Sequence, residues 1–312
     1  MSEQHKPDYL DLDWSALIAD RFEKWENMLT EYEARGVKKI PLWENQNYPV
    51  PHVEGFVPGL VLYPVHEEKR GMLVICAGGG FMFKSSNEAK EIADYFYEKG
   101  LNVAILDYAV KDPKCAGTTL SIDPDVMKTA CEDAKRAIRL LRYHADEWNI
   151  CADKIGIGGF SAGGIITSLL LTHYDNGNSE HADPVERVSC RPDATFQMYG
   201  SFRNILDTSG GGLGLGFDFS AKHKTAETDV VLNLPLDLPP MFMAQTDSDD
   251  PVNLLDMGRA YYERGIPFEV HLFHGGPHGG GLYDGKHEDS PLFPHTAHWA
   301  ELAAEWFAQQ GF

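Results

Sequence analysis

The stretch Lys154–Gly164 reads KIGIGGFSAGG and predicts a strand, a tight turn and a helix in immediate succession. The isoleucines before the turn are β-branched residues typical of a buried strand, and the apolar residues after it form a helix face. The turn itself is Gly-x-Ser-x-Gly, in which Gly159 and Gly163 flank Ser161. Glycine at these positions lets the backbone fold sharply enough to expose the hydroxyl. This context predicts a nucleophile at Ser161 rather than an ordinary glycine loop.

Strands and helices alternate along most of the remaining chain. Further strands are expected at Leu60–Val65, Met72–Cys76, Val103–Leu106, Thr195–Tyr199, Met241–Ala244 and Phe268–Phe273. Helices are expected at about Asp13–Glu33, Ser85–Tyr97, Asn253–Arg264 and Thr296–Phe307, and a long one begins at Asp123-Pro124. This alternation implies an α/β fold with a doubly wound, mostly parallel sheet and helices on both faces. Ligands of such folds bind at the carboxyl ends of the strands.

The chain divides at about residue 60. Residues 1–59 hold an amphipathic helix and a proline-containing extended connector, both expected to pack on the body, and residues 60–312 form the catalytic domain. The aromatic stripe of the helix is typical of packing; a homo-oligomer contact and a wall over the active site are alternatives. Ser85, with Glu88 three residues later, predicts a capping box. The glycine-rich stretch Ser209–Ala221 predicts a mobile loop.

Composition disfavours several classes of partner. The 312 residues are 43% hydrophobic and 24% charged, as in soluble globular proteins, and no apolar run approaches the roughly 20 residues of a membrane span. The formal net charge of −20 disfavours nucleic acids and anionic membrane surfaces, because both would be repelled. The N-terminal residues carry no pattern of a secretory signal, so we expect a cytoplasmic protein. The five cysteines include no Cys-x-x-Cys pair and are expected to be reduced.

A serine hydroxyl needs a base to accept its proton and an acidic group to orient that base. In a sheet of this type the chain order is serine, then Asp or Glu, then His, each following a later strand. His278 is the candidate base, because flanking glycines let its loop return over the nucleophile. His274, nearer the preceding strand, is the alternative.

Three aspartates after the strand Met241–Ala244 compete for the role of the acid. Asp250 is the first choice, because Pro251 fixes the turn that follows the strand. Asp249 is the alternative acid, and Asp247 ranks third. Spacing alone does not separate positions that differ by one residue.

Backbone N–H groups usually stabilise the oxyanion that forms during acyl transfer. Ala162 offers one at the start of its helix, and Gly79 and Gly80 offer others after the strand Met72–Cys76. The glycines are not followed by Lys-Ser/Thr and form no Gly-x-Gly-x-x-Gly pattern, so a nucleotide site is not expected. One histidine cluster lacks a cysteine or a second carboxylate at ligand spacing, and therefore predicts surface residues rather than a metal site: His287, His295 and His298.

The motifs between about Met72 and Phe307 occur together in a known family. They are Gly78–Phe81, Glu132–Arg139, Gly159–Gly164, Asp249–Val252 and Gly275–Gly279. With them the chain resembles the α/β-hydrolase superfamily, in particular bacterial carboxylesterases related to acetylxylan and feruloyl esterases. The resemblance implies Ser161 as the nucleophile, His278 as the base and Asp250 or Asp249 as the acid. It also implies oxyanion donors at Gly79, Gly80 and Ala162, and no cofactor.

The prediction is a serine carboxylesterase that works through an acyl-enzyme. No lipase-like cap is evident in the sequence, which favours short acyl groups such as acetyl on a carbohydrate or other small neutral alcohol. A peptidase of the prolyl-oligopeptidase kind is one alternative, although that family usually carries a large extra domain. A binding protein that uses a hydrolase fold without catalysis is another, although such proteins typically lack a member of the Ser/Asp/His set.

Overall fold

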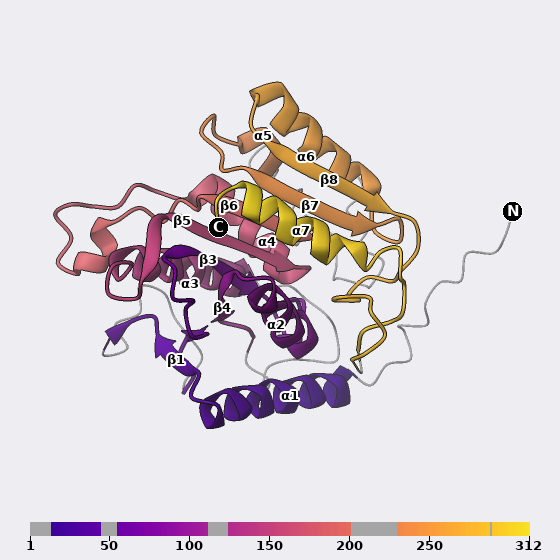
Figure 1. The fold of residues 1–312 in the computed structure, drawn as a ribbon, viewed down its shortest axis with the longest axis horizontal. Helices are drawn as coiled ribbons and strands as arrows, with labels where there is room; N and C mark the ends of the chain where they lie inside the picture. The colour runs from indigo at the N-terminus through magenta and orange to yellow at the C-terminus, as the bar shows by residue number, and fades with distance from the viewer. Residues whose placement is uncertain (1–13, 45–54, 112–123, 201–229, 288) are drawn as a thin grey trace, which may run out of the picture.

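The computed structural model describes residues 14–44, 55–111, 124–200, 230–287 and 289–312 (Figure 1). The strands in these ranges are β1 (Lys38–Pro41), β2 (Gly59–Leu62), β3 (Arg70–Cys76), β4 (Asn102–Asp107), β5 (Ile150–Phe160), β6 (Ala194–Met198), β7 (Met241–Thr246) and β8 (Phe268–Phe273). The helices are α1 (Trp14–Ala34), α2 (Lys90–Glu98), α3 (Pro124–Tyr143), α4 (Ala162–His173), α5 (Val230–Asn233), α6 (Pro251–Arg264) and α7 (His298–Gln309). Two short 3₁₀ helices are η3 (Ser86–Glu88) and η4 (Pro184–Arg187).

The described strands form one sheet in the order β1-β2-β4-β3-β5-β6-β7-β8. From β4 to β8 every neighbouring pair is parallel, whereas β2 is antiparallel to both β1 and β4. The predicted doubly wound, mostly parallel sheet is therefore confirmed. Strands β2 and β3 follow each other in the chain but are not neighbours in the sheet, because β4 lies between them. In a parallel sheet the carboxyl ends of the strands share one edge.

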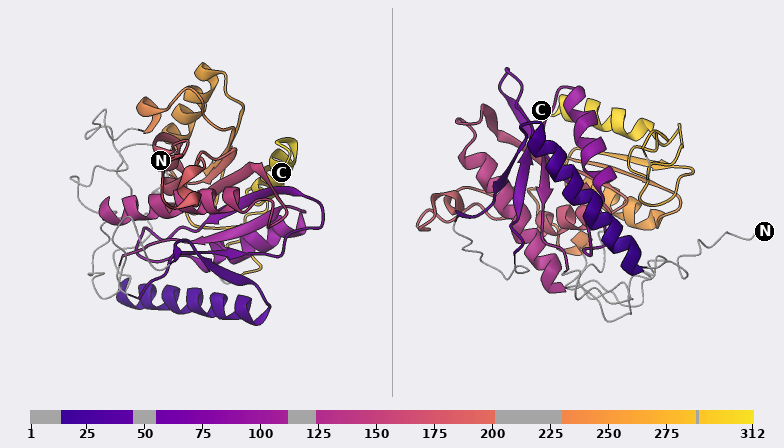
Figure 2. Two further views of the ribbon diagram at one scale, coloured as in Figure 1. Left: turned by 90° about the vertical axis from the view of Figure 1, so that its left-hand side faces the viewer. Right: turned by 90° about the horizontal axis from the view of Figure 1, so that it is seen from below.

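Helices cover both faces of the sheet (Figures 1 and 2). On one face α3, α4 and α6 bury apolar residues against the strands, and on the other face α1, α2 and α7 do the same. Strands of such a sheet are apolar on both sides, and β4, β6 and β7 are buried along their whole length. Helix α4 is itself buried at almost every position, which places the residue before it deep in the body.

The N-terminal helix α1 packs on the body beside β1 and η3 (Figure 2). Trp25 is buried, and its indole Nε1 donates a hydrogen bond of 3.0 Å to Asp107 at the end of β4. Arg21 pairs with Asp289, which lies in the segment before α7. The expected cap residues at positions 13 and 123, part of the connector (45–54) and the glycine-rich stretch 209–221 lie outside the described residues. Among the helices described, none has the length and apolar character needed to cross a membrane.

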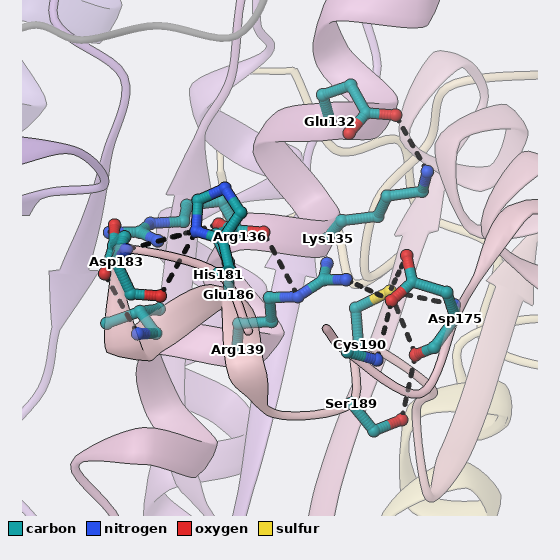
Figure 3. A network of polar contacts seen from close by, with 12 residues as sticks. Glu132, Lys135, Arg136, Arg139, Asp175, His181, Asp183, Glu186, Ser189 and Cys190 are labelled. Atoms are coloured by element: carbon teal, nitrogen blue, oxygen red, sulfur yellow. Dashed lines mark hydrogen bonds and ion pairs between the residues drawn. The ribbon is translucent and has the colours of Figure 1, made fainter. Parts of the chain in front are cut away.

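A network of ion pairs connects the segment after α4 to α3 (Figure 3). Arg136, buried on α3, pairs with Asp183 at 2.8 Å and with Glu186 at 2.7 Å. Its Nε also donates to the carbonyl of Leu42 at 2.7 Å, so the same guanidinium holds the connector. Arg139, one turn further along, pairs with Asp175. These contacts connect α3 to the segment after α4 and to the connector.

The predicted capping box is wrong. The side chain of Ser85 makes no cap hydrogen bond, and α2 begins only at Lys90, after the short helix η3. Glu88 turns inward instead, where its carboxylate accepts a hydrogen bond of 2.8 Å from the backbone N–H of Gly78. A buried N–H needs an acceptor, and the N–H of Gly78 finds it in the Glu88 carboxylate, which the sequence pattern had assigned to the N-terminus of a helix.

Candidate active site

Loops that follow parallel strands converge at one edge of the sheet, and Figure 1 shows the arrowheads of β5 and β7 pointing to the same side. Strand β3 leads into the glycine loop (residues 77–81), and β5 leads into Ser161. Strand β7 leads into residues 247–250, and β8 leads into the histidine loop (residues 274–281). The sheet therefore gathers the sequence-predicted site residues from distant parts of the chain.

Ser161 occupies a sharp elbow between β5 and α4. Its backbone has φ 49° and ψ −113°, a conformation uncommon for a residue with a side chain. A Cβ atom on Gly159 would lie 2.5 Å from the carbonyl oxygen of Cys76, and one on Gly163 would lie 2.0 Å from the same oxygen. Both flanking positions therefore require glycine, because β3 passes too close for any side chain.

The imidazole of His278 lies between Ser161 and Asp249. Its Nε2 is 2.9 Å from Ser161 Oγ, and its Nδ1 is 2.7 Å from Asp249 Oδ1. The carboxylate accepts the Nδ1 hydrogen, so in this tautomer Nε2 carries the lone pair that can accept the hydroxyl proton of the serine. The side chains of His278 and Asp249 are 22% and 16% exposed, so the pair is largely shielded from water.

Asp250, the first-choice acid, is not the partner of His278. Its carboxylate accepts a hydrogen bond of 2.9 Å from the backbone N–H of Val252 and caps the N-terminus of α6. Pro251 takes the first position of that helix, which leaves the residue before it in the cap position. The alternative acid, Asp249, lies one residue earlier and is the aspartate that reaches the imidazole.

His274 and Asp247, the remaining candidates for the base and the acid, pair with each other away from Ser161. The side chain of His274 is 95% exposed, and its Nδ1 pairs with Asp247. Asp247 also accepts a hydrogen bond of 2.9 Å from the backbone N–H of Gly275. This pair ties the start of the histidine loop to the end of β7.

The glycine loop runs directly beside the nucleophile. A Cβ atom on Gly78 would lie 3.0 Å from the Cβ of Ser161, and Gly79 and Gly80 have φ of +131° and +61°. The N–H groups of Gly79 and Gly80 donate to no other group in the ranges that the structure describes. Ala162 is the first residue of α4, a position whose N–H has no partner within a helix. Within the described part of the chain, the geometry leaves these three predicted donors able to face a ligand.

The electrostatic surroundings of His278 favour its protonated form. Burial alone would lower the pKa of the imidazole, but Asp249, which is close and hydrogen-bonded, outweighs it and raises the pKa above the usual value. Glu88 adds a smaller effect in the same direction. An imidazole of this kind is well suited to accept a proton during a reaction and to hold it briefly.

Two residues near the site were missed by the sequence analysis. Glu88 is 2% exposed, and besides Gly78 it accepts a hydrogen bond of 2.7 Å from the hydroxyl of Tyr199. The Tyr199 ring lies 4.8 Å from the ring of His278, centroid to centroid. The sequence offered one signal for Glu88, a carboxylate following the glycine loop, but the capping pattern gave it another interpretation. No local pattern distinguishes Tyr199.

The histidine cluster stays on the surface. His287, His295 and His298 are all exposed, as expected. The rings of His295 and His298 lie 6.2 Å apart, and His287 lies beside Glu91. In the described ranges, no group of three or more His, Cys, Asp or Glu side chains is arranged to hold a metal ion.

A known family matches the part of the chain that carries most of this site. The profile of the BD-FAE family matches residues 60–256, which is more than half of the chain and includes the glycine loop, Ser161 and Asp249. The chain belongs to the BD-FAE family. Within this BD-FAE chain, the matched region ends inside α6, before the histidine loop.

Two curated relatives are longer proteins. Endo-1,4-beta-xylanase B of Butyrivibrio fibrisolvens is 28% identical in an alignment 292 residues long, which covers 85% of the BD-FAE chain and 42% of the relative. Acetylxylan esterase of Xylanibacter ruminicola is 25% identical over 109 residues, or 35% of this chain and 20% of the relative. The BD-FAE chain thus spans less than half the length of either protein.

Solved structures share the fold over most of this chain. An acetyl ester-xyloside bifunctional hydrolase from Caldicellulosiruptor lactoaceticus is 30% identical, with a TM-score of 0.71 over 87% of this chain and 96% of that one. The carboxylesterase Cest-2923 from Lactobacillus plantarum is 21% identical, with a TM-score of 0.64 over 88% of this chain and 97% of that one, which shows the fold alone. The BD-FAE chain has the α/β-hydrolase fold and resembles acetylxylan esterases.

Proposed function

We propose that this BD-FAE protein is a serine carboxylesterase that removes short acyl groups, acetyl above all, from a carbohydrate or another small neutral alcohol. One observation carries the proposal: Asp249, His278 and Ser161 form a continuous line of hydrogen bonds, of 2.7 and 2.9 Å, at the carboxyl edge of the sheet. An acid, a base and a nucleophile in this order are the machinery of acyl transfer.

In the first half of the reaction, Ser161 Oγ attacks the carbonyl carbon of the ester while its proton passes to His278 Nε2. Asp249 stabilises the imidazolium that results. The carbonyl oxygen becomes an oxyanion, which the N–H groups of Gly79 and Ala162 can receive together with that of Gly80. The C–O bond to the alcohol then breaks, and the alcohol leaves with the proton from Nε2.

In the second half, water repeats the attack on the acyl-enzyme. His278 accepts a proton from the water molecule, whose oxygen bonds to the acyl carbon. The bond between that carbon and Ser161 Oγ breaks, the serine recovers its proton from Nε2, and the carboxylic acid leaves. Each half uses the same groups, and neither requires a cofactor for the atoms and charges to balance.

Two relatives support acetyl groups and carbohydrates as the substrate class. The B. fibrisolvens protein is named a xylanase, and the C. lactoaceticus structure is titled an acetyl ester-xyloside bifunctional hydrolase. Both align with most of this chain, at 28% and 30% identity. A chain with 47 acidic and 27 basic residues also suits a neutral substrate better than an anionic one.

Labelling with a fluorophosphonate probe tests the nucleophile. The probe should phosphonylate Ser161 Oγ with loss of fluoride, and Ser161→Ala should remain unlabelled while unfolding at the wild-type temperature. A panel of p-nitrophenyl esters from acetate to laurate, beside acetylated xylo-oligosaccharides, tests the acyl group and the alcohol. We expect acetate to be cleaved fastest; an unlabelled wild type, or equal labelling of Ser161→Ala, would contradict the proposal. Cytoplasmic location and self-association through α1 stay predictions.

A further inference from the structure

Glu88 is a buried carboxylate that the proposed reaction does not use directly. It lies at the end of η3, is 2% exposed, and each of its oxygens accepts one hydrogen bond. Oε2 accepts from the N–H of Gly78 at 2.8 Å, and Oε1 accepts from the hydroxyl of Tyr199 at 2.7 Å. Burying a carboxylate costs free energy that its hydrogen bonds have to offset, so the presence of Glu88 in the interior needs an explanation.

The contact with Gly78 fixes the glycine loop. A Cβ atom on Gly78 would lie only 2.4 Å from Glu88 Oε2, so the loop backbone touches the carboxylate directly. Because the N–H of Gly78 donates to Glu88, the orientation of the backbone is fixed where the Gly79 and Gly80 peptide planes begin. The N–H groups of Gly79 and Gly80 themselves have no partner in the described part of the chain. Oxyanion donors are effective only when their direction is set before the charge forms.

The contact with Tyr199 fixes the histidine loop. The hydroxyl oxygen of Tyr199 accepts a hydrogen bond of 3.1 Å from the N–H of Gly281, so its own hydrogen is directed to Glu88. Tyr199 has φ +41°, which is unfavourable for a bulky residue, and its backbone N–H donates to the carbonyl of Ala244 on the neighbouring strand β7. Strain of this kind persists only where surrounding contacts impose it. The ring then lies against His278.

We propose that Glu88 is a positioning residue for ester cleavage at Ser161. As an ionised carboxylate it joins the glycine loop to the histidine loop and supports the imidazolium of His278. The inference rests on the proposed function and extends it with a second carboxylate, on a different element from Asp249.

The directions of the hydrogen bonds agree with the ionised form. Both partners of Glu88 donate, which suits an ionised carboxylate, because it accepts at both oxygens and has no hydrogen of its own that needs an acceptor. Burial raises the pKa of Glu88 above its usual value; the hydrogen bonds from Tyr199 and Gly78 and the charges of His278 and Arg21 reduce this rise without cancelling it. The titratable groups that face Glu88 come from several elements: Arg21, Tyr108, Tyr199, His278 and Tyr283.

Glu88→Gln removes the charge and keeps the shape. The amide oxygen can still accept from Gly78, but its NH₂ then faces Tyr199, whose hydroxyl already receives a hydrogen from Gly281 and would be left without an acceptor. We expect kcat for p-nitrophenyl acetate to fall about tenfold to a hundredfold, with KM changed less than about threefold. The acid limb of the pH profile should move to lower pH, because the charge that helps to raise the pKa of His278 is gone.

Glu91→Gln is the matched control, since it makes the same chemical change nearby. Glu91 lies on α2 and faces His287 rather than His278, so its loss should leave kcat and the acid limb unchanged. Tyr199→Phe removes only the hydroxyl, and should lower kcat by about threefold to thirtyfold with the protein still folded. It decides the matter if Glu88→Gln does not fold.

A readout that needs no substrate separates this inference from the proposed function. The imidazole of His278 can be titrated by NMR, with its signal assigned by its absence in His278→Gln. Glu88→Gln should lower the measured pKa, and Glu91→Gln should not. An unlabelled wild type would overturn the esterase proposal, while the titration of His278 would still test whether Glu88 acts on the imidazole. The role of Glu88 would be overturned if Glu88→Gln and Tyr199→Phe both kept the wild-type kcat. It would also be overturned if kcat fell but neither the acid limb of the pH profile nor the measured pKa of His278 moved.

Discussion

Replacing the two neighbouring aspartates separately tests which carboxylate serves His278. In Asp249→Asn the partner of Nδ1 loses its charge but not its size, and in Asp250→Asn the same change is made one residue later. Asparagine caps helices about as well as aspartate, so Asp250→Asn should retain the hydrogen bond from Val252 and the start of α6. The pair of variants therefore differs in one respect only, contact with the imidazole.

The size of the effect follows from the geometry. Nδ1 and Oδ1 are 2.7 Å apart. This places the centres of charge of an imidazolium and the carboxylate roughly 4 Å apart, worth about 4 kcal/mol at an effective dielectric constant of about 20. Loss of that energy in the transition state is about a thousandfold in kcat, at about 1.4 kcal/mol per tenfold. Asparagine can also turn its NH₂ toward Nδ1, which moves the imidazole hydrogen to Nε2 and blocks proton transfer from Ser161. We expect kcat to fall by about 10³- to 10⁴-fold in total.

Initial rates on p-nitrophenyl acetate from pH 5 to 9 measure both variants. Asp250→Asn should keep kcat within about twofold of wild type and unfold within a few tenths of a kcal/mol of it. In the residual activity of Asp249→Asn the acid limb should lie at lower pH, because burial of His278 is no longer opposed by the carboxylate that raises its pKa. A large loss in Asp250→Asn beside near-normal activity in Asp249→Asn would refute the assignment.

Two further predictions concern the scaffold. Arg136→Ala should lower the free energy of unfolding in urea titrations by about 3 kcal/mol and leave kcat unchanged. This value is near the lower end of the range for a buried ion pair, because the carboxylate partners are partly exposed. An unaltered urea midpoint would count against the network in Figure 3. Asp107→Asn should cost about 3–5 kcal/mol, because it leaves the buried Lys84 without its charge partner. Burial alone would raise the pKa of Asp107, but Lys84 and Lys39 depress it below the usual 3.8, so its contribution should be complete above that pH and disappear only in stronger acid. If the difference in stability between wild type and Asp107→Asn were already lost at pH 5, this prediction would be wrong.

The sequence predicted those parts of the site that depend on backbone geometry. Ser161 was predictable because only glycine fits at Gly159 and Gly163, where β3 passes within 2.0 to 2.5 Å of a would-be Cβ, and the motif records that requirement. The order of strands predicted that His278 would return to the same edge. Such features follow from sterics and from the parallel sheet, and both leave a pattern in a single sequence.

The choice between the aspartates failed for a local reason that the sequence did contain. Asp-Pro at a helix start places the aspartate at the cap and the proline in the first turn, as predicted for Asp123-Pro124. The same reasoning at Asp250-Pro251 assigns Asp250 to the cap of α6 and leaves Asp249 free for His278. Interpreting Pro251 as a turn residue instead shifted the acid by one position. In a loop this short, that shift decides which side chain points to the imidazole.

Glu88 shows where a local pattern loses to the interior. A capping hydrogen bond at an exposed helix end is worth about 1 kcal/mol, whereas a buried N–H without an acceptor costs about 1–3 kcal/mol. Gly78 presents such an N–H, and Tyr199 presents a buried hydroxyl hydrogen that also needs an acceptor, so the carboxylate that satisfies both outweighs the cap on Ser85. The two demands come from β3 and β6, which are distant in sequence and separated only by β5 in the sheet. A capping pattern covers four residues and contains no information about them, and for that reason the residue best placed to join the two loops was assigned to a helix end.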